Sequence, residues 1–468
     1  MTIPLKSSAS ISLVSLVLLI TGAIDSIRNL PATALFGSSL IFFFIVSSII
    51  FLIPVAFVAA ELASTWSDEE GGIYFWVKQA FGEQWAFMTI WLQWINTIVW
   101  YPSMISFIAG TAAYFFDPSW ATHKMYIITV IIVVFWTMTL INLRGVSTSA
   151  RFAAICAVLG MLIPMALIII LGIIWICKGN PIHVSFSVNT LIPHWKDNAS
   201  WISLTAIMTS FLGMELAAVH VKQVKNPQRN FPRAILYSVL LILSTIIFGS
   251  LAIAFVLPSQ DISLVSGVMQ AFNNFFAVYH LQYMTPIITA LLLLGSLGGM
   301  TNWIIAPVKG LLMAAEGGYM PPILARRNAR GVPVNLLLLQ AILVTCFCGA
   351  FVLIPSVNGI YWLLTALSTQ LYMLMYVMMF LAALKIRNKK KHKKNAKTFS
   401  IPGGRAGFFV TCILGLLGCF ITLIVGFIPP EILDIGSVLR YELTFCIGFV
   451  GLLIPSVLFY YYRKRRKI

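Results

Sequence analysis

Residues 21 to 31 read TGAIDSIRNLP and interrupt an otherwise apolar stretch of the chain. ISLVSLVLLI (11–20) precedes them, and ALFGSSLIFFFIVSSIIFLIPVAFVAA (34–60) follows them. A charged side chain at membrane depth costs at least about 2.5 to 3.5 kcal/mol on insertion scales, so it usually faces the protein interior or a water-filled cavity. Asp25 and Arg28 therefore raise the question of what the interior of this membrane segment contains.

The composition indicates an integral membrane protein. The 468-residue chain is 60% hydrophobic and 10% charged, whereas an average soluble protein is about 25% charged. Runs of about 20 apolar residues are long enough to cross a bilayer as helices. Such runs lie at 11–32, 36–62, 85–116, 125–143, 153–177, 201–221, 234–257, 283–314, 335–355, 359–384, 408–428 and 441–462. The predicted fold class is an all-α integral membrane protein with twelve transmembrane helices.

The distribution of basic residues predicts the orientation of these helices. The formal net charge is +17, and most Lys and Arg residues fall in alternate loops, as they do on the cytoplasmic side of membrane proteins. An even number of spans then places both termini in the cytoplasm. The run KIRNKKKHKK (385–394) is interpreted as a topology anchor near anionic lipid, so membrane lipid is an expected partner and nucleic acid is not.

Signals of other function classes are lacking in the sequence. No stretch resembles a Walker A loop, the cysteines have none of the paired spacings of zinc sites, and His220 is the only histidine within a predicted span. We therefore expect no cofactor, no metal and no enzymatic activity. The segment 261–281 is too polar to span a bilayer and is predicted to lie as an interfacial helix.

Two of the predicted spans are interrupted in comparable ways. Thr21-Gly22-Ala23 lies in the middle of the first span, and SFLGME (210–215) lies in the middle of the sixth. Many secondary transporters consist of two inverted repeats whose first helices break at the bilayer midplane and expose backbone groups to the substrate. Glycine supports such a break because it accepts backbone angles that other residues avoid. Glycines that allow close helix packing are the alternative, and the spacing alone does not distinguish the two.

Motifs along almost the whole chain resemble the amino acid, polyamine and organocation superfamily of transporters, and within it the bacterial glutamate/GABA antiporter branch. In chain order they are IPVAFVAAELAS, EEGGIYFWV, GMELAAVHVKQVKNPQRNFP, LVSGVMQAF, NWIIAPVKGLLMAAEGGYMPP, LYMLMYV and TFSIPGG. The resemblance implies a LeuT-like five-plus-five inverted repeat with discontinuous helices 1 and 6, alternating access, and a bacterial inner membrane location. The predicted parts are a cytoplasmic N-terminus (1–10), a first repeat (11–177), a second repeat (201–384), a basic cytoplasmic loop (385–407), two further helices (408–462) and a basic tail (463–468).

The resemblance also implies roles for individual residues. The substrate carboxylate is expected at the break in helix 1, formed by Thr21, Gly22 and Ala23. The substrate α-amino group is expected at the carbonyls of the break in helix 6, formed by Phe211, Leu212 and Gly213. The resemblance further places in or beside the pocket Asn302, Trp303, Tyr372 and Tyr376, with Glu215 as a hydrogen-bonding residue near the break. Packing in the membrane core is the alternative role for Trp303 and the two tyrosines.

The sequence departs from the family pattern at four places, three relative to the glutamate/GABA antiporters and one relative to ion-coupled members. Asp25-Ser26-Ile27-Arg28 replaces a tyrosine-bearing stretch, and Gln93 replaces a tyrosine on helix 3 within the expected site. Family members that couple to protons or sodium often carry a lysine where we align Gly160. The chain also stops at RKRRKI instead of a long cytoplasmic plug. These departures favour exchange of one amino acid for another and leave both glutamate specificity and acid gating unsupported.

Asp25 admits three interpretations. It caps the outer half of helix 1, pairs with Arg28 one turn later, or faces the substrate. A carboxylate that faces the substrate favours a cationic side chain, such as that of arginine, lysine or ornithine. The leading hypothesis is therefore a cationic amino acid exchanger that acts as a monomer or homodimer. The alternatives are a glutamate/GABA-type antiporter and an amino acid sensor that does not transport.

Overall fold

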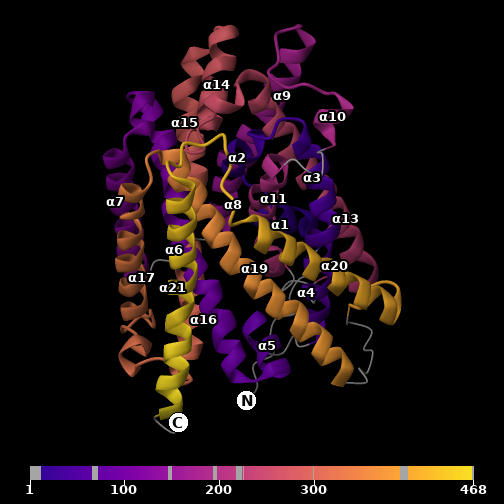
Figure 1. The fold of residues 1–468 in the computed structure, drawn as a ribbon, viewed down its shortest axis with the longest axis vertical. Helices are drawn as coiled ribbons and strands as arrows, with labels where there is room; N and C mark the ends of the chain where they lie inside the picture. Colours follow the sequence, from indigo (N-terminus) through magenta and orange to yellow (C-terminus); the bar gives the residue numbers. More distant parts are fainter. Residues whose placement is uncertain are drawn as a thin grey trace.

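The computed structural model describes residues 12–65, 72–145, 150–192, 198–217, 224, 226–298, 300–389 and 399–465. The predicted N-terminus (1–10), His220 and much of the basic loop therefore lie outside the described residues. Figure 1 shows that the described chain forms one bundle of helices, with both chain ends marked at its lower end. We call this the terminus end of the bundle and the opposite one the far end.

Helices form almost all of the regular structure in these residues. In the first repeat they are α1 (Leu13–Ile24), η1 (Ile27–Asn29), α2 (Leu30–Ala34), α3 (Ser39–Ser47), η2 (Ser48–Leu52), α4 (Ile53–Thr65), α5 (Ile73–Phe81), α6 (Glu83–Ala112), α7 (Lys124–Leu143), α8 (Ala150–Ala157), η5 (Val158–Leu162) and α9 (Ile163–Cys177). They continue with α10 (Val188–Leu191), α11 (Asn198–Ser210), α12 (Met214–Ala217), α13 (Pro227–Val256), α14 (Gly267–Val278), α15 (Thr285–Gly298), α16 (Met300–Glu316), α17 (Val334–Phe347), α18 (Ala350–Leu353), α19 (Val357–Lys389), α20 (Gly404–Val425) and α21 (Val438–Arg465).

The membrane spans agree with the predicted fold class. Among the described residues, ten helical stretches are long and apolar enough to cross a membrane, and Leu13–Gly22 with Ile27–Ala34 forms a further span bent by 41°. The remaining predicted span consists of two short pieces, α11 and α12. The all-α membrane architecture with discontinuous first and sixth helices is therefore confirmed.

Two helices form the centre of the bundle. Within the most apolar window of each span, 78% of the residues are buried in the span that contains α6 and 72% in the span that contains α19, against 11% for α21. α6 packs directly along α19, while α21 lies on the outside of the bundle (Figure 1). Side chains from α6 and α19 are therefore the ones that reach the interior.

The break in helix 6 lies where the sequence predicts it. α11 ends at Ser210, a turn follows from Phe211 to Gly213, and α12 begins at Met214. Gly213 has φ +96°, a left-handed conformation that a side chain would disfavour. A glycine is therefore required at this turn, as its predicted role implies.

The break in helix 1 differs from the prediction. α1 continues as a regular helix through Thr21, Gly22 and Ala23 to Ile24, and the extended residues are Asp25 and Ser26. Gly22 does not adopt a positive φ. The prediction that the helix unwinds at 21–23 is therefore wrong: the break lies three to four residues later, at the polar pair Asp25 and Ser26 instead of at the glycine.

The polar segment 261–281 contains a helix, as predicted, at the far end of the bundle (Figure 1). This helix, α14, packs against α13, α15, α9 and α2. Its apolar side chains, including Val268, Phe272 and Phe275, are fully buried against the protein. α14 therefore covers the far end of the bundle at the level of α2, the outer half of helix 1.

Candidate functional site

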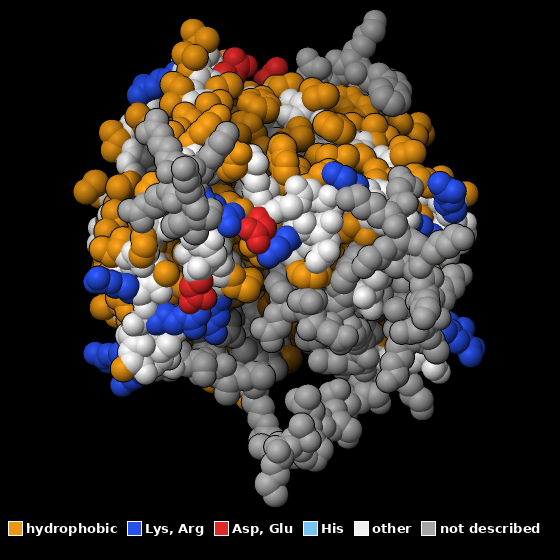
Figure 2. All heavy atoms as spheres, turned by 90° about the horizontal axis from the view of Figure 1, so that it is seen from below, with side chains coloured by type: hydrophobic (Ala, Val, Ile, Leu, Met, Phe, Trp, Pro, Cys, Tyr) orange, Lys and Arg blue, Asp and Glu red, His pale blue; other side chains and the backbone are white. Residues whose placement is uncertain are grey.

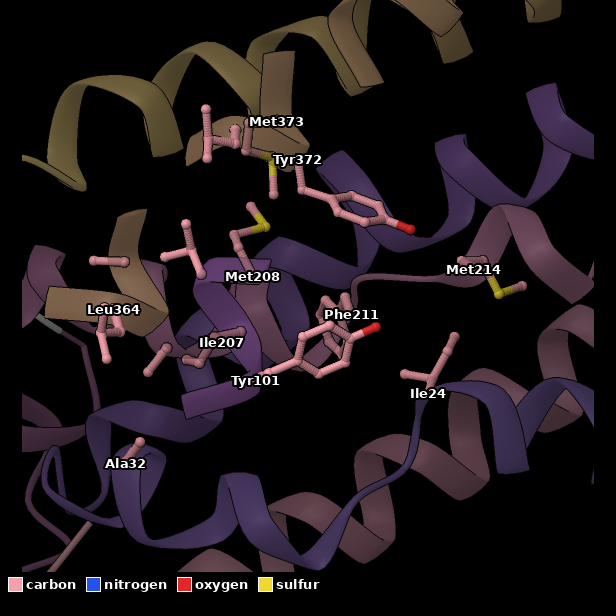
Figure 3. Packing of buried hydrophobic residues seen from close by; sticks show 14 of the residues in the cluster. Ile24, Ala32, Tyr101, Ile207, Met208, Phe211, Met214, Leu364, Tyr372 and Met373 are labelled. Atoms are coloured by element: carbon pink, nitrogen blue, oxygen red, sulfur yellow. The ribbon is translucent and has the colours of Figure 1, made fainter. Parts of the chain in front are cut away.

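The two breaks face each other in the interior of the bundle. α12, directly after the helix 6 break, packs against α1, which ends at the helix 1 break. Figure 3 shows Ile24, Phe211 and Met214 beside these breaks, with the rings of Tyr101 and Tyr372 reaching toward them from α6 and α19. Free backbone amides are expected at Ile27, because the segment that begins there has no side-chain cap from Ser26.

A buried carboxylate and two tyrosines fix the helix 6 break. Glu215 is 4% exposed and lies in the first turn of α12, where a negative charge is favourable. Its Oε1 accepts a 2.6 Å hydrogen bond from the hydroxyl of Tyr372, and its Oε2 accepts one from the hydroxyl of Tyr376. The Tyr376 hydroxyl also accepts a 3.0 Å bond from the Gly213 N–H. Tyr376 therefore links α19 to both sides of the turn.

Gln93 of α6 joins this group, since its side chain lies beside the Tyr372 hydroxyl. Leu212 is partly buried, whereas Phe211 is fully buried against Phe44 with ring centroids 5.7 Å apart. The structure therefore brings together the predicted residues of helix 3 (α6), helix 6 (α11 and α12) and helix 10 (α19). Their direct contact with a substrate stays a prediction.

Asp25 points toward α13 and not toward Arg28. Its Oδ2 accepts a 2.8 Å hydrogen bond from the Thr245 hydroxyl, and its side chain is 3% exposed. Asp25 follows α1 as its C-terminal cap residue, while Ser26 precedes the outer half. Both structural interpretations from the sequence, a cap on the outer half-helix and a pair with Arg28, are therefore wrong. Contact with substrate stays a prediction, and Oδ1 of Asp25 has no hydrogen-bond partner among the described residues.

Arg28 lies in an aromatic environment instead. Its guanidinium carbon is 4.5 Å from the ring centroid of Trp100, and Trp100 in turn contacts Trp303 with centroids 5.6 Å apart. The Nε of Arg28 is buried without a hydrogen-bond partner among the described residues, and no described carboxylate forms an ion pair with this side chain. A cation at this depth without an anionic partner is energetically unfavourable.

Trp303 is held through its backbone. Pro307 lies inside α16 and has no N–H, so the carbonyl four residues earlier, that of Trp303, loses its helical partner. The hydroxyl of Tyr101 donates a 2.9 Å hydrogen bond to this carbonyl. The Trp303 side chain remains 38% exposed although it lies in a membrane span. The side chain of Asn302 lies outside the described residues.

Sequence reasoning missed the residues that support Trp303. Gln340 of α17 is fully buried, donates to the carbonyl of Ile304 at 3.3 Å, and accepts from the Trp94 indole at 3.0 Å. Tyr101 and Gln340 are polar side chains within apolar spans, and the proline four residues after Trp303 marks a carbonyl that needs a donor. Polar side chains in apolar spans, together with a proline that frees a carbonyl, are the sequence features that could have identified this support.

The predicted carboxylate site on helix 1 has mixed surroundings. Gly22 is exposed, and a Cβ built there meets no atom within 4 Å, so open space adjoins the helix. The Thr21 hydroxyl oxygen is buried without a partner among the described residues. Of Ala23 only the backbone is described. The role of these three residues stays a prediction, while the nearest free amides belong to the outer half-helix.

Gly160 occupies a position with no room for a side chain. It lies in η5, and a Cβ built on it would collide with the backbone of Gly295 in α15. One turn away, Gly298 lies against the side chain of Cys156. The lysine that coupled family members carry therefore does not fit this helix crossing.

The comparisons with known proteins agree with this architecture. The model of the amino acid permease family matches residues 11–452. An uncharacterized transporter of Legionella pneumophila is 41% identical over 442 residues, which cover 94% of each chain. A glutamate/gamma-aminobutyrate antiporter of Lactococcus lactis is 27% identical, with 97% of this chain and 91% of the relative covered. A probable agmatine/putrescine antiporter of the same species is 25% identical, with 86% and 84% covered. The chain thus belongs to the amino acid permease family of the amino acid, polyamine and organocation superfamily.

Proposed function

We propose that this protein is an amino acid exchanger that works by alternating access and accepts substrates in which a carboxylate lies at the opposite end of the carbon chain from the amino group, such as glutamate and GABA. The observation that carries this proposal is Arg28, a cation at membrane depth that stacks on Trp100 and has no described anionic partner. Trp100 also contacts Trp303, the expected closing aromatic. These two contacts connect the positive charge to the residue that is expected to close over the substrate.

A substrate carboxylate would supply the missing partner of Arg28. Guanidinium and carboxylate form strong, charge-assisted hydrogen bonds, and an intramembrane ionisable residue commonly marks a substrate pathway. Glutamate and GABA share an amino group and a terminal carboxylate, so one site serves both exchange partners. The helix 1 amides and the helix 6 carbonyls suit the α-carboxylate and the amino group, because half-helix ends carry opposite partial charges.

The cationic hypothesis keeps one supporting observation. Oδ1 of Asp25 has no described partner, so it remains able to accept a bond from a cationic group. The other oxygen is already bonded to Thr245 on α13, and the side chain is almost fully buried. We therefore rank a substrate such as arginine or lysine second. The agmatine/putrescine antiporter relative is consistent with it, and the glutamate/gamma-aminobutyrate antiporter relatives are consistent with the first proposal.

The close contact between Gly160 and the Gly295 backbone leaves no room for the helix 5 lysine that ion-coupled family members carry. This contact therefore favours exchange over ion-coupled uptake.

We further propose that the terminus end faces the cytoplasm of a bacterial inner membrane. Figure 2 shows this end, where Lys and Arg side chains project around an apolar surface. Among the described residues, Lys78, Arg327 and Arg463 form ion pairs there with Glu83 and Glu316.

The test is counterflow in proteoliposomes loaded with unlabelled glutamate. Labelled glutamate or GABA should enter only when an exchangeable amino acid is present inside, and arginine should support much less entry. Binding without any such entry would favour the sensor alternative. Entry that depends on internal arginine or lysine, and not on glutamate, would favour the cationic exchanger.

A further inference from the structure

A small cavity with several polar side chains in a mostly apolar lining lies one helical turn beyond the breaks, on the side of the far end. It is enclosed by η1 and α2, by α11 and by α19, which belong to helices 1, 6 and 10. Its lining residues are Asn29, Ala32, Thr205, Ala206, Thr209, Tyr361, Trp362, Thr365 and Ala366. The cavity therefore adjoins the candidate site but shares none of its predicted residues.

Three buried polar atoms of the lining have no hydrogen-bond partner among the described residues: Oγ1 of Thr205, Oγ1 of Thr365 and Nε1 of Trp362. Helical threonines commonly donate to a carbonyl of their own helix, as Thr209 does to Thr205 at 2.6 Å and Thr369 does to Thr365 at 2.8 Å. The two unpaired hydroxyls depart from this pattern. Since an indole nitrogen only donates, Trp362 requires an acceptor.

The surroundings of the cavity favour an anionic acceptor. No carboxylate lines it, and the hydroxyls, the indole and the Asn29 amide are all able to donate hydrogen bonds. Arg28 directly precedes Asn29, a lining residue, so a cationic residue adjoins the lining in the chain. A carboxylate here would accept from the unpaired donors and interact with the nearby cation.

We propose that this cavity is an accessory subsite for a carboxylate of the amino acid on its way between the central site and the far end. This inference rests on the proposed exchange function. The lining comes from the outer halves of both broken helices and from α19, so relative movement of these three elements changes the size of the cavity. In this proposal the cavity is closed in the present structure, and the substrate carboxylate occupies it when the transporter opens toward the far end.

The subsite predicts an effect on one side of the membrane only. Thr205→Val/Thr365→Val removes both hydroxyls with little change of shape, and a hydrogen bond to a charged group contributes enough that KM should rise about tenfold for substrate added from the far end. KM for substrate added from the terminus end should stay within about twofold. The two sides are compared in right-side-out and everted membrane vesicles.

Thr139→Val is the matched control, because Thr139 is equally buried but its hydroxyl donates to Phe135 of its own helix at 2.8 Å. Trp362→Phe provides an independent variant that removes only the indole donor. Equal KM changes on both sides, or none on either side, would overturn the subsite. A difference that disappears when chloride is replaced by gluconate would assign the cavity to an inorganic anion and also reject the proposal. Wild-type protein that exchanges no amino acid would reject the exchange function and the subsite together.

Discussion

The hydroxyl of Tyr101 donates a 2.9 Å hydrogen bond to the backbone carbonyl of Trp303. This carbonyl lacks its usual helical donor because residue 307 is a proline. A side chain from α6 therefore replaces a backbone bond of α16 at the residue expected to close over the substrate. The position of Trp303 depends on a contact between two helices that are distant in sequence.

We predict that Tyr101→Phe destabilises the protein by about 1 to 3 kcal/mol, because it leaves a buried carbonyl without a donor. In a Pro307→Ala background, the introduced alanine supplies the missing N–H, so the same substitution should cost less than about 1 kcal/mol. Thermal unfolding of the four proteins of this cycle measures the difference. Tyr126→Phe, which removes a 3.0 Å bond to the Ala109 carbonyl, should show no such coupling. Equal effects of Tyr101→Phe in both backgrounds would contradict the assignment.

Trp303→Ala should nearly abolish exchange while the protein remains folded. The side chain is 38% exposed, so its loss removes less packing than that of a fully buried tryptophan, whereas occlusion of substrate requires a closing element. Trp120→Ala is the control, since Trp120 is 40% exposed and lies in the loop before α7. Wild-type exchange by a folded Trp303→Ala variant would assign Trp303 to packing alone.

Arg28→Gln should weaken glutamate and GABA by about ten- to a hundredfold, because a charge-assisted contact contributes roughly 1.5 to 3 kcal/mol. Arginine has a cationic side chain that Arg28 repels, so its weaker binding should stay the same or improve. Competition binding of glutamate, GABA, arginine and lysine measures all four. Asp25→Asn is the companion variant, since it keeps the side-chain size and an oxygen for Thr245. A selective loss of arginine and lysine in Asp25→Asn would instead support the cationic exchanger.

Gly160→Ala should destabilise the protein by about 1 to 3 kcal/mol, because the added methyl group meets the Gly295 backbone. Gly451→Ala is the matched control: Gly451 is also in a helix, but a Cβ there meets no atom within 4 Å. The control should be neutral or slightly stabilising, as alanine is the better helix former. Similar unfolding temperatures for the two variants would refute the close crossing.

A cysteine at Lys391, which lies outside the described residues, should react with a membrane-impermeant maleimide only after permeabilisation. The reason is the predicted cytoplasmic location of the basic loop. The exposed native thiols of Cys177, Cys346 and Cys446 are first replaced by serine. Lys178→Cys, in the loop before α10, should react in intact cells. Reversed labelling of the two positions would invert the proposed topology.

The helix 6 break was predictable because its cause is local. Gly213 adopts a positive φ, and the sequence places this glycine within the segment from Ser210 to Glu215, which interrupts an apolar span. The helix 1 break was misplaced because its cause is distant: Asp25 bonds Thr245, which is 220 residues away. Gly22 is compatible with either conformation and remains helical.

The hydrogen bonds that hold the candidate site together were even harder to predict from the sequence. Glu215 and the two tyrosines follow from motif resemblance, but no motif states that both hydroxyls bond one carboxylate across more than 150 residues. Trp94 and Gln340 form their bond across 246 residues. Such pairs depend on how helices pack, and periodicity within each helix carries no information about its partner.

The contact between Gly160 and Gly295 has a consequence for motion. At Gly160 and Gly295 the two helices meet main chain to main chain, so no side chain of either residue obstructs rotation about this contact. We expect helix 5, which consists of α8, η5 and α9, and helix 8, which consists of α15 and α16, to pivot about this crossing, so that their ends move apart on one side as they approach on the other. Spin labels beside the crossing should then keep a constant separation through the transport cycle, while pairs at the helix ends change in opposite senses.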